Sequence, residues 1–279
     1  LMCCDANTSS PASVIDSLRV LAVQADKPFA EPGETVHLEA LIADPLGDGR
    51  AISVAWGTCV NPGSAELPAC ASAVASFQTS GSSFDVTVPS GALDGAPADA
   101  QVGSVGVVFA ACAGTLSSVR HGLSPVTCVD AVGKTNDRAT FVWGEKRITV
   151  LRGLRNANPK IARLRVDGLI WPETEERTLK ACDVNAVSDC PIAGQHTLQL
   201  DITKDSVETY FGQTEDVVVF FFTSQGVLRD EFARPDTDGA TLTAVALNKP
   251  DRTRGELLWF VVRDDRGGVS FTSRRARIE

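Results

Sequence analysis

The stretch LLWFVVRDDRGGVSFTSRRARI, residues 257–278, decides the fold class of this chain. Two runs of mostly apolar, β-branched and aromatic residues flank the segment RDDRGG, residues 263–268, whose aspartates and glycines are typical of a turn. Strong β-formers on both sides of a short loop predict an antiparallel hairpin of residues 257–263 and 269–278. Residues 257–262 are apolar on both faces, which is typical of a strand in the middle of a sheet.

Similar strand patterns occur along the whole chain. Apolar and polar residues alternate with a period of two in the segments 35–42, 84–88, 162–167 and 197–203. Two further runs, 105–112 and 217–222, are apolar on both faces and are predicted to be central strands. No window shows a long, capped helical period. The chain is therefore predicted to be all-β, built of antiparallel β-sandwiches with few short helices.

The length of 279 residues favours two domains, because a domain typically has about 150 residues. A linker is expected at residues 152–159, after a strand at 140–151, and Pro159 ends it. We therefore predict a leading segment at 1–12, a first sandwich at 13–155 and a second at 156–279.

The charge of the chain excludes one class of function. Asp and Glu number 35 against 26 Lys and Arg, so the net charge is −9. A nucleic-acid binder would instead carry a basic face. No stretch approaches the roughly 18 uninterrupted apolar residues of a membrane-spanning helix.

The cysteines indicate an oxidising compartment. None of the eight forms a Cys-x-x-Cys pair, and none of the three histidines lies within four residues of a cysteine, so zinc-site spacings are absent. Two cysteines lie at the N-terminus, and we predict that the other six pair sequentially as Cys59–Cys70, Cys112–Cys128 and Cys182–Cys190. Sequence alone does not choose the connectivity, and six reduced, buried cysteines in a cytosolic protein are the alternative.

The N-terminus, Leu1-Met2-Cys3-Cys4, resembles the end of a bacterial lipoprotein signal sequence, in which an apolar run leads to a lipidated cysteine. The acceptor is expected to be Cys4, or else Cys3, because the residue before the modified cysteine is usually small. The polar residues that follow, up to Pro11, would form a flexible tether. The alternative is a disordered leader with two thiols of no function.

Several motifs resemble bacterial immunoglobulin-like and polycystic-kidney-disease-like domains. They are Val20-Leu21-Ala22-Val23, then Pro32-Gly33-Glu34-Thr35-Val36, then Asp44-Pro45-Leu46-Gly47, and the final hairpin Phe260–Val269. With the cysteine start, the chain is similar to envelope lipoproteins of myxobacteria and related bacteria. The resemblance implies two tandem Ig-like sandwiches and an envelope location. The immunoglobulin order Cys…Trp…Cys is not reproduced, because Trp56 precedes Cys59 by only three residues.

Motifs for catalysis are absent from the sequence, including Gly-x-Ser-x-Gly, His-Glu-x-x-His, Gly-x-Gly-x-x-Gly and the P-loop. The histidines His37, His121 and His196 are expected to be surface or structural residues. No enzymatic activity and no cofactor are therefore predicted.

Carboxylates in turns give only a weak calcium hypothesis. The segment beginning at Asp236 and Asp238 starts like a calcium loop, but Ala240 stands at a ligand position and no Glu follows at the twelfth. Asp44, Asp48, Asp264 and Asp265 also lie in turns and could gather at one end of a sandwich to hold calcium. The favoured interpretation is that these aspartates stabilise turns and that no metal is bound.

Two features are candidates for contact with a partner. Trp56, Trp143 and Trp259 lie in strand patterns and are expected in the core. Trp171 in Leu169-Ile170-Trp171-Pro172 is the best candidate among them for an exposed contact, although a lid over its own core is favoured over a platform for a ligand. The basic residues Arg274, Arg275 and Arg277 could contact lipid headgroups or an acidic subunit, or could protect a strand edge against aggregation.

These observations predict a non-enzymatic, lipid-anchored envelope protein that acts as an accessory subunit of a larger cell-surface or outer-membrane assembly. Its partners would be envelope proteins and, through the lipid, the membrane, with no nucleic acid and no small-molecule ligand. The alternatives are a carbohydrate-binding or adhesive module, and an enzyme whose residues converge only in three dimensions.

Overall fold

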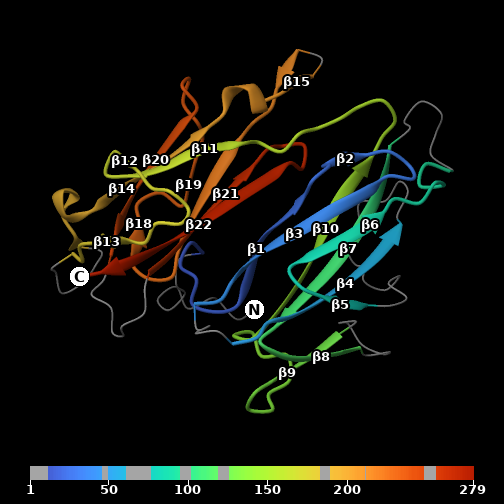
Figure 1. Ribbon diagram of the computed structural model, residues 1–279, viewed down its shortest axis with the longest axis horizontal. Helices are drawn as coiled ribbons and strands as arrows, with labels where there is room; N and C mark the ends of the chain where they lie inside the picture. The colour runs from blue at the N-terminus through green and yellow to red at the C-terminus, as the bar shows by residue number, and fades with distance from the viewer. Residues whose placement is uncertain are drawn as a thin grey trace, which may run out of the picture.

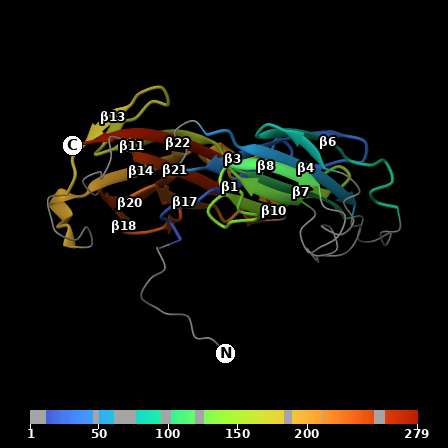
Figure 2. The same ribbon diagram turned by 90° about the horizontal axis from the view of Figure 1, so that it is seen from below.

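The computed structural model describes residues 12–45, 50–60, 77–94, 102–118, 126–182, 189–210, 212–247 and 256–279. Two β-sandwiches lie side by side, one from each half of the chain (Figures 1 and 2). Helical structure in the described residues consists of the short 3-10 turns Ile192–Gly194 and Lys204–Ser206 and of Asp189, which is also in 3-10 conformation. The predicted all-β class with few short helices is thus confirmed.

The first sandwich consists of a three-stranded and a five-stranded sheet. The smaller sheet has the order β1 (Arg19–Ala25), β3 (Thr35–Ala43), β6 (Ser83–Thr87). The larger has the order β2 (Phe29–Ala30), β10 (Phe141–Val150), β7 (Gly103–Cys112), β4 (Ser53–Val60), β5 (Gln78–Ser80). A hairpin of β8 (Gly114–Ser118) and β9 (Val126–Asp130) extends from the connection between β7 and β10 (Figure 1).

The second sandwich consists of two five-stranded sheets. One has the order β12 (Leu169–Ile170), β11 (Ile161–Val166), β14 (His196–Ile202), β20 (Ala240–Ala246), β18 (Val227–Leu228). The other has the order β13 (Arg177–Leu179), β22 (Val269–Ile278), β21 (Glu256–Arg263), β17 (Val218–Thr223), β19 (Phe232–Ala233). A small hairpin, β15 (Thr209–Tyr210) with β16 (Gln213–Thr214), projects from it.

The two sandwiches share one topology. In each, the first strand belongs to one sheet, and a short strand then crosses to the other sheet and pairs parallel with the last strand. These crossing strands are β2, which pairs with β10, and β13, which pairs with β22, whereas the other strand pairings are antiparallel. This arrangement is an Ig-like sandwich occurring twice in tandem.

A cross-strand aromatic pair lies at the centre of each sandwich. Trp56 on β4 is fully buried, lies opposite Phe109 on β7 and stacks on Phe84 with 5.7 Å between ring centroids. Phe221 on β17 lies opposite Phe260 on β21, with the rings edge to face at 6.0 Å. Immunoglobulin domains pack a tryptophan of this strand on a disulfide, and here Trp56 packs on two aromatic rings instead.

A third apolar cluster joins the sandwiches and explains the strands that are apolar on both faces. The inner faces of β17 and β21 pack in the core of the second sandwich. Their outer faces, with β22, pack against the start of the first sandwich in a cluster that contains Ile15, Leu21, Ala22, Ala43, Trp259, Val261 and Val269. The two sandwiches therefore bury apolar surface against each other as well as inside themselves.

Hydrogen bonds across the junction add to this packing. The amide of Ile15 donates to Thr223 O at 2.8 Å, and the amide of Thr223 donates to Ser13 O at 2.9 Å. Arg263 Nη2 donates to Leu21 O at 2.8 Å, and Lys146 Nζ donates to Gly267 O at 2.7 Å. The predicted division assigns residues 13–15 to the first sandwich, and their main-chain bonds are to the second.

Two of the predicted disulfides are present. Cys112–Cys128 links the end of β7 to β9, and Cys182–Cys190 closes a loop after β13. Cys59 is disulfide-bonded, and its predicted partner Cys70 lies outside the described residues.

Substitution of two tryptophans tests which of them packs in the core of the first sandwich. Trp56→Ala is expected to lower the free energy of unfolding by about 3–5 kcal/mol, because the ring is lost from a packed centre. Trp143, predicted to be buried, is 45% exposed on β10, so Trp143→Ala is the matched control, with an expected change within about 0.5 kcal/mol. Urea unfolding followed by circular dichroism measures both, and equal losses would contradict this core assignment.

The junction also predicts a dependence of stability on pH. Burial, together with the nearby charge of Arg263, lowers the pKa of Lys146 from 10.5 to about 8. Between these values the unfolded chain binds more protons than the folded one, so this lysine makes stability rise with pH. From pH 7.5 to 9 the rise is expected to reach up to about 1 kcal/mol. Urea unfolding of the wild type and Lys146→Met at both pH values measures it, and identical slopes for the two proteins would disprove it.

Candidate functional site

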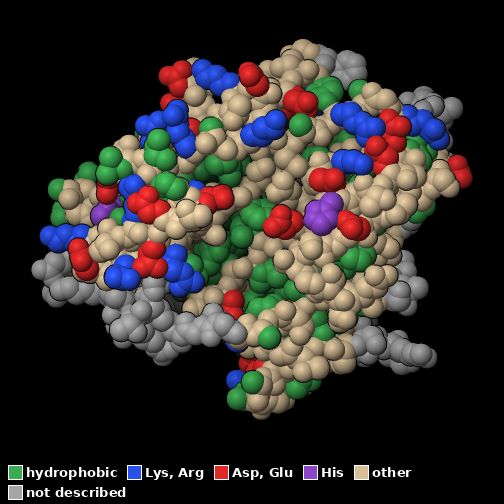
Figure 3. Space-filling view, in the orientation of Figure 1, with side chains coloured by type: hydrophobic (Ala, Val, Ile, Leu, Met, Phe, Trp, Pro, Cys, Tyr) green, Lys and Arg blue, Asp and Glu red, His purple; other side chains and the backbone are tan. Residues whose placement is uncertain are grey.

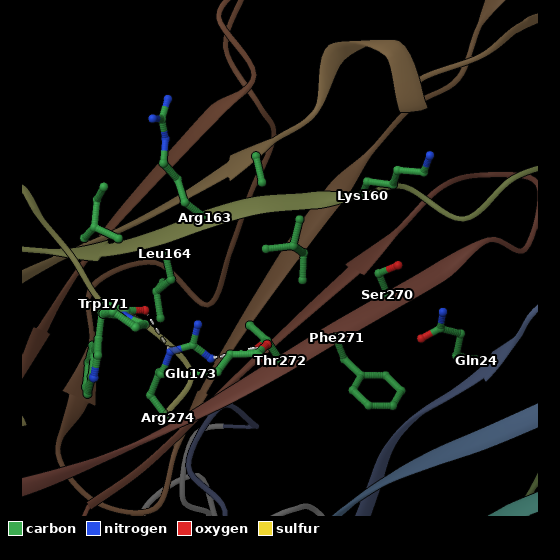
Figure 4. Close-up of a pocket in the computed structure, with 14 residues that line it drawn as sticks. Gln24, Lys160, Arg163, Leu164, Trp171, Glu173, Ser270, Phe271, Thr272 and Arg274 are labelled. Atoms are coloured by element: carbon green, nitrogen blue, oxygen red, sulfur yellow. Dashed lines mark hydrogen bonds and ion pairs between the residues drawn. The ribbon is translucent and has the colours of Figure 1, made fainter. Parts of the chain in front are cut away.

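A groove of about 640 Å³ lies on the flank of the second sandwich, between β11 of one sheet and β22 of the other. We call it the flank groove. Gln24 of β1 lies at one end of it, and the segment Trp171-Pro172-Glu173 lines the other (Figure 4). In the space-filling view, hydrophobic side chains are visible in the hollow between the two halves of the molecule, and charged side chains surround it (Figure 3).

The groove exists because both strands beside it are only partly paired on this side. β12 pairs with Arg165 and Val166 alone, at the far end of β11. β13 pairs only with residues 276–278 of β22. As far as the described residues show, the earlier parts of β11 and β22 therefore have a free edge, and a free edge presents unpaired main-chain N–H and C=O groups.

Hydrogen bonds show which residues of β22 direct their main-chain groups into the groove. The amide of Val269 donates to Asn158 Oδ1 at 2.8 Å, and the amide of Glu279 donates to Leu179 O at 3.1 Å, both on the free side. Because main-chain groups alternate along a strand, Phe271 and Ser273 also direct theirs to this side. Among the described residues, the N–H and C=O of Phe271 and the N–H of Ser273 have no partner there.

Arg274 lies in the groove as a buried cation. Its side chain alternates with the exposed Ser273 and Arg275, and it is only 6% exposed. Nε donates to Trp171 O at 3.0 Å, and Nη1 donates to Thr272 Oγ1 at 2.6 Å and to Ser273 O at 2.7 Å, all neutral acceptors (Figure 4). Burial lowers the pKa of this guanidinium below its ordinary value.

Of the two interpretations of Trp171, the structure supports the lid over its own core and not the exposed contact. Its ring is 1% exposed and belongs to the core of the second sandwich, with Nε1 donating to Glu175 O at 2.8 Å. Its amide donates to Leu164 O at 2.8 Å, so the residue closes the end of the groove as a lid over its own core. A ring buried in this way offers no face on which a sugar could stack.

The three predicted contact arginines do not form one surface. Arg274 lies inside the groove, whereas Arg275 and Arg277 are exposed on the other face of β22. Arg277 Nη2 forms an ion pair with Glu176 Oε1 at 3.2 Å. The sequence did not single out Lys160, Leu164 and Thr272, which line the groove with Arg274.

The weak calcium candidates act in turns. Asp236 Oδ1 accepts hydrogen bonds from the amides of Asp238 and Ala240. Asp264 Oδ1 accepts hydrogen bonds from the amides of Arg266 and Gly268, and Asp265 Oδ1 from that of Asp216. Within the described part of the chain, these carboxylates and the histidines and cysteines form no group of three or more that could hold a metal. The described hydrogen bonds thus give these aspartates a role in stabilising loops, and Asp238 Oδ1 accepts a hydrogen bond from Lys204 Nζ at 3.3 Å.

Two of the histidines pair with carboxylates. His37 Nδ1 lies 2.6 Å from Asp85 Oδ1, and His196 Nδ1 lies 2.8 Å from Asp167 Oδ2. The second nitrogen of His196 lies 2.9 Å from Lys180 O, so both of its ring nitrogens are occupied.

The predicted positions Cys3, Cys4, Asp48 and His121 lie outside the described residues, as Cys70 does. In the part of the chain that is described, no helix is long and apolar enough to span a bilayer. The disulfides are typical of an oxidising compartment and indicate an extracellular or envelope protein.

Comparison with known proteins finds weak structural likenesses. No protein-family model matches the chain, and no curated protein matches it. The structure is similar to the D0–D1 domains of intimin, with a TM-score of 0.26 and 15% identity over 92% of this chain and 95% of that one. It is also similar to the Yersinia pseudotuberculosis adhesin InvE, with a TM-score of 0.23 and 11% identity over 94% of this chain and 60% of that one. These values describe a general likeness and assign no activity.

The contribution of the Arg274 charge to stability can be compared with the contribution of apolar packing beside it. Arg274→Met is expected to change the free energy of unfolding by less than about 1 kcal/mol, because the loss of hydrogen bonds to neutral acceptors is offset by removal of a desolvated charge. Leu164→Ala, at a neighbouring position that is 1% exposed, is expected to cost about 2–5 kcal/mol. Urea unfolding of both variants measures this, and a loss above about 3 kcal/mol in Arg274→Met would show that the arginine is needed for folding.

Proposed function

We propose that this protein is a non-enzymatic interaction subunit of a bacterial envelope. A lipid on Cys4, or else on Cys3, would hold it at the outer membrane, within a larger cell-surface or outer-membrane assembly. The two-sandwich body would present a binding edge to a partner protein. The observation that carries the proposal is the free edge of β22 beside the flank groove.

The geometry of that edge supports binding by strand addition. A strand added to an exposed edge gains main-chain hydrogen bonds, and side-chain pockets next to the edge give selectivity. Phe271 and Ser273 supply main-chain groups, and the groove supplies the side-chain space. The apolar junction between the sandwiches supports this function as well, because it holds Gln24 of the first sandwich at one end of the groove.

The proposed anchor rests on the sequence Leu1-Met2-Cys3-Cys4 and on the disulfides, which favour an exported protein. Lipidation of an N-terminal cysteine supplies more than one acyl chain, which stable anchoring requires. The carbohydrate-binding alternative depended on an exposed Trp171, and the burial of that ring removes its support.

Intact-mass analysis tests the anchor. The full precursor, expressed in a bacterium that exports it and extracted in detergent, is expected to carry the added mass of two or three acyl chains. Cys4→Ser should move the protein from the membrane fraction to the soluble fraction, whereas Cys3→Ser should leave it in the membrane. A free, unacylated N-terminus would refute the anchor.

Site-specific photocrosslinking tests the binding edge in the same cells. A photoreactive residue in place of Ser270, inside the groove, is expected to give a discrete crosslinked protein. The same residue in place of Lys134, which is 67% exposed in the first sandwich, should give none and serves as the control. Crosslinking at Lys134 alone would locate the partner surface elsewhere.

A further inference from the structure

The flank groove contains a positive charge that the described part of the chain leaves largely uncompensated. Arg274 is buried, and its hydrogen bonds go to neutral oxygens. The carboxylate beside it, Glu173 Oε1, lies 3.9 Å away on a side chain that is 76% exposed. Among the described residues no acceptor bonds to Nη2 of this guanidinium. A buried cation without a close counter-charge is costly, so the site favours an anion.

The other charges of the groove point the same way. Lys160 lies near the end formed by Gln24 and Ser270, and its amine has no ion pair within the described residues (Figure 4). Arg163 does not add to the charge in the groove, because it points away from it and pairs with Asp201 (Figure 4). A groove with two cations and one exposed carboxylate, in a protein of net charge −9, is a local basic site.

The free edge of β22 favours a ligand with an extended main chain. From Ser270 to Arg275 the edge extends about 17–20 Å, at about 3.3 Å per residue, enough for a strand of about five residues. A strand paired with Phe271 and Ser273 would place every second side chain on the inner face, in the row of Thr272 and Arg274. Directly opposed side chains on one face have Cβ atoms about 5 Å apart, within reach of a carboxylate–guanidinium contact.

We propose that the flank groove binds an extended segment of a partner protein that adds to β22 and places one inward-facing glutamate or aspartate on Arg274. The inward neighbours of that acid are apolar and pack toward Leu164 and Ile161. The inference rests on the proposed strand addition and adds the chemistry by which the partner is recognised.

Two end-capped heptapeptides test the proposal on the full chain. In both, threonine alternates with inward-facing residues, which are valine, glutamate, valine in one peptide and valine, glutamine, valine in the other. Binding is measured by titration followed by NMR of the amides of Phe271 and Ser273. The glutamate peptide is expected to bind at least about tenfold more tightly than its glutamine twin, because a charge-assisted bond replaces a neutral one. With Arg274→Met the two peptides should bind equally, whereas Arg275→Ala, on the exposed face, should keep the difference.

The outcomes separate the inference from the proposed function. Equal binding of both peptides by the wild type, with shifts at Phe271 and Ser273, would overturn the acidic specificity and leave strand addition intact. Absence of shifts with either peptide would overturn strand addition itself. An oligogalacturonate that binds through Arg274 without shifting these amides would identify an acidic glycan as the ligand and overturn the proposal.

Discussion

The outer face of the sheet formed by β22, β21 and β17 is apolar and has to be covered, and the rest of the architecture depends on this constraint. Trp259 and Val261 of β21 lie on this face with Phe220 and Phe222 of β17, and the start of the first sandwich packs on them. Burial of each large side chain contributes about 1.5–3 kcal/mol, which is large compared with the polar contacts between typical linked domains. The first sandwich therefore completes the second, because it covers this apolar face.

The linker between the sandwiches forms hydrogen bonds with both the first and the second sandwich. Arg155 Nη1 donates to Glu34 Oε2 of the first sandwich at 2.6 Å, and this bond lowers the pKa of Glu34 to about 2. The amide of Ala157 donates to Glu208 Oε2 of the second sandwich at 3.0 Å. Asn158 contacts both, since its Nδ2 donates to Ala25 O and its Oδ1 accepts the amide of Val269. These bonds fix the path of the chain at the end of the groove.

The sequence predicted where the strands are, but not which other parts of the chain pack against them. Apolar residues on both faces of 217–222 and 257–262 predicted central strands, and β17 and β21 are central. Periodicity cannot show what covers the second face, because the cover comes from the start of the first sandwich, far away in the sequence. The sequence left open whether Trp171 contacts a partner or covers its own core, and the pairing of β12 with β11 decides this, because it places the indole in the core. Arg274 lies in a strand whose residues alternate between buried and exposed. The sequence pattern did not indicate that Arg274 is one of the buried residues and points into the groove.

The short contact of Ser13–Ile15 with Thr223 has a mechanical consequence. The bridge between Val14 and Thr223 is parallel, and it ties the residues leading into β1 to the last residue of β17. A force applied to the residues before Ser13 would act first on the junction between the two sandwiches. It would not directly separate β1 from β3. An attachment at this point would therefore load the junction between the sandwiches before the edge strand β1.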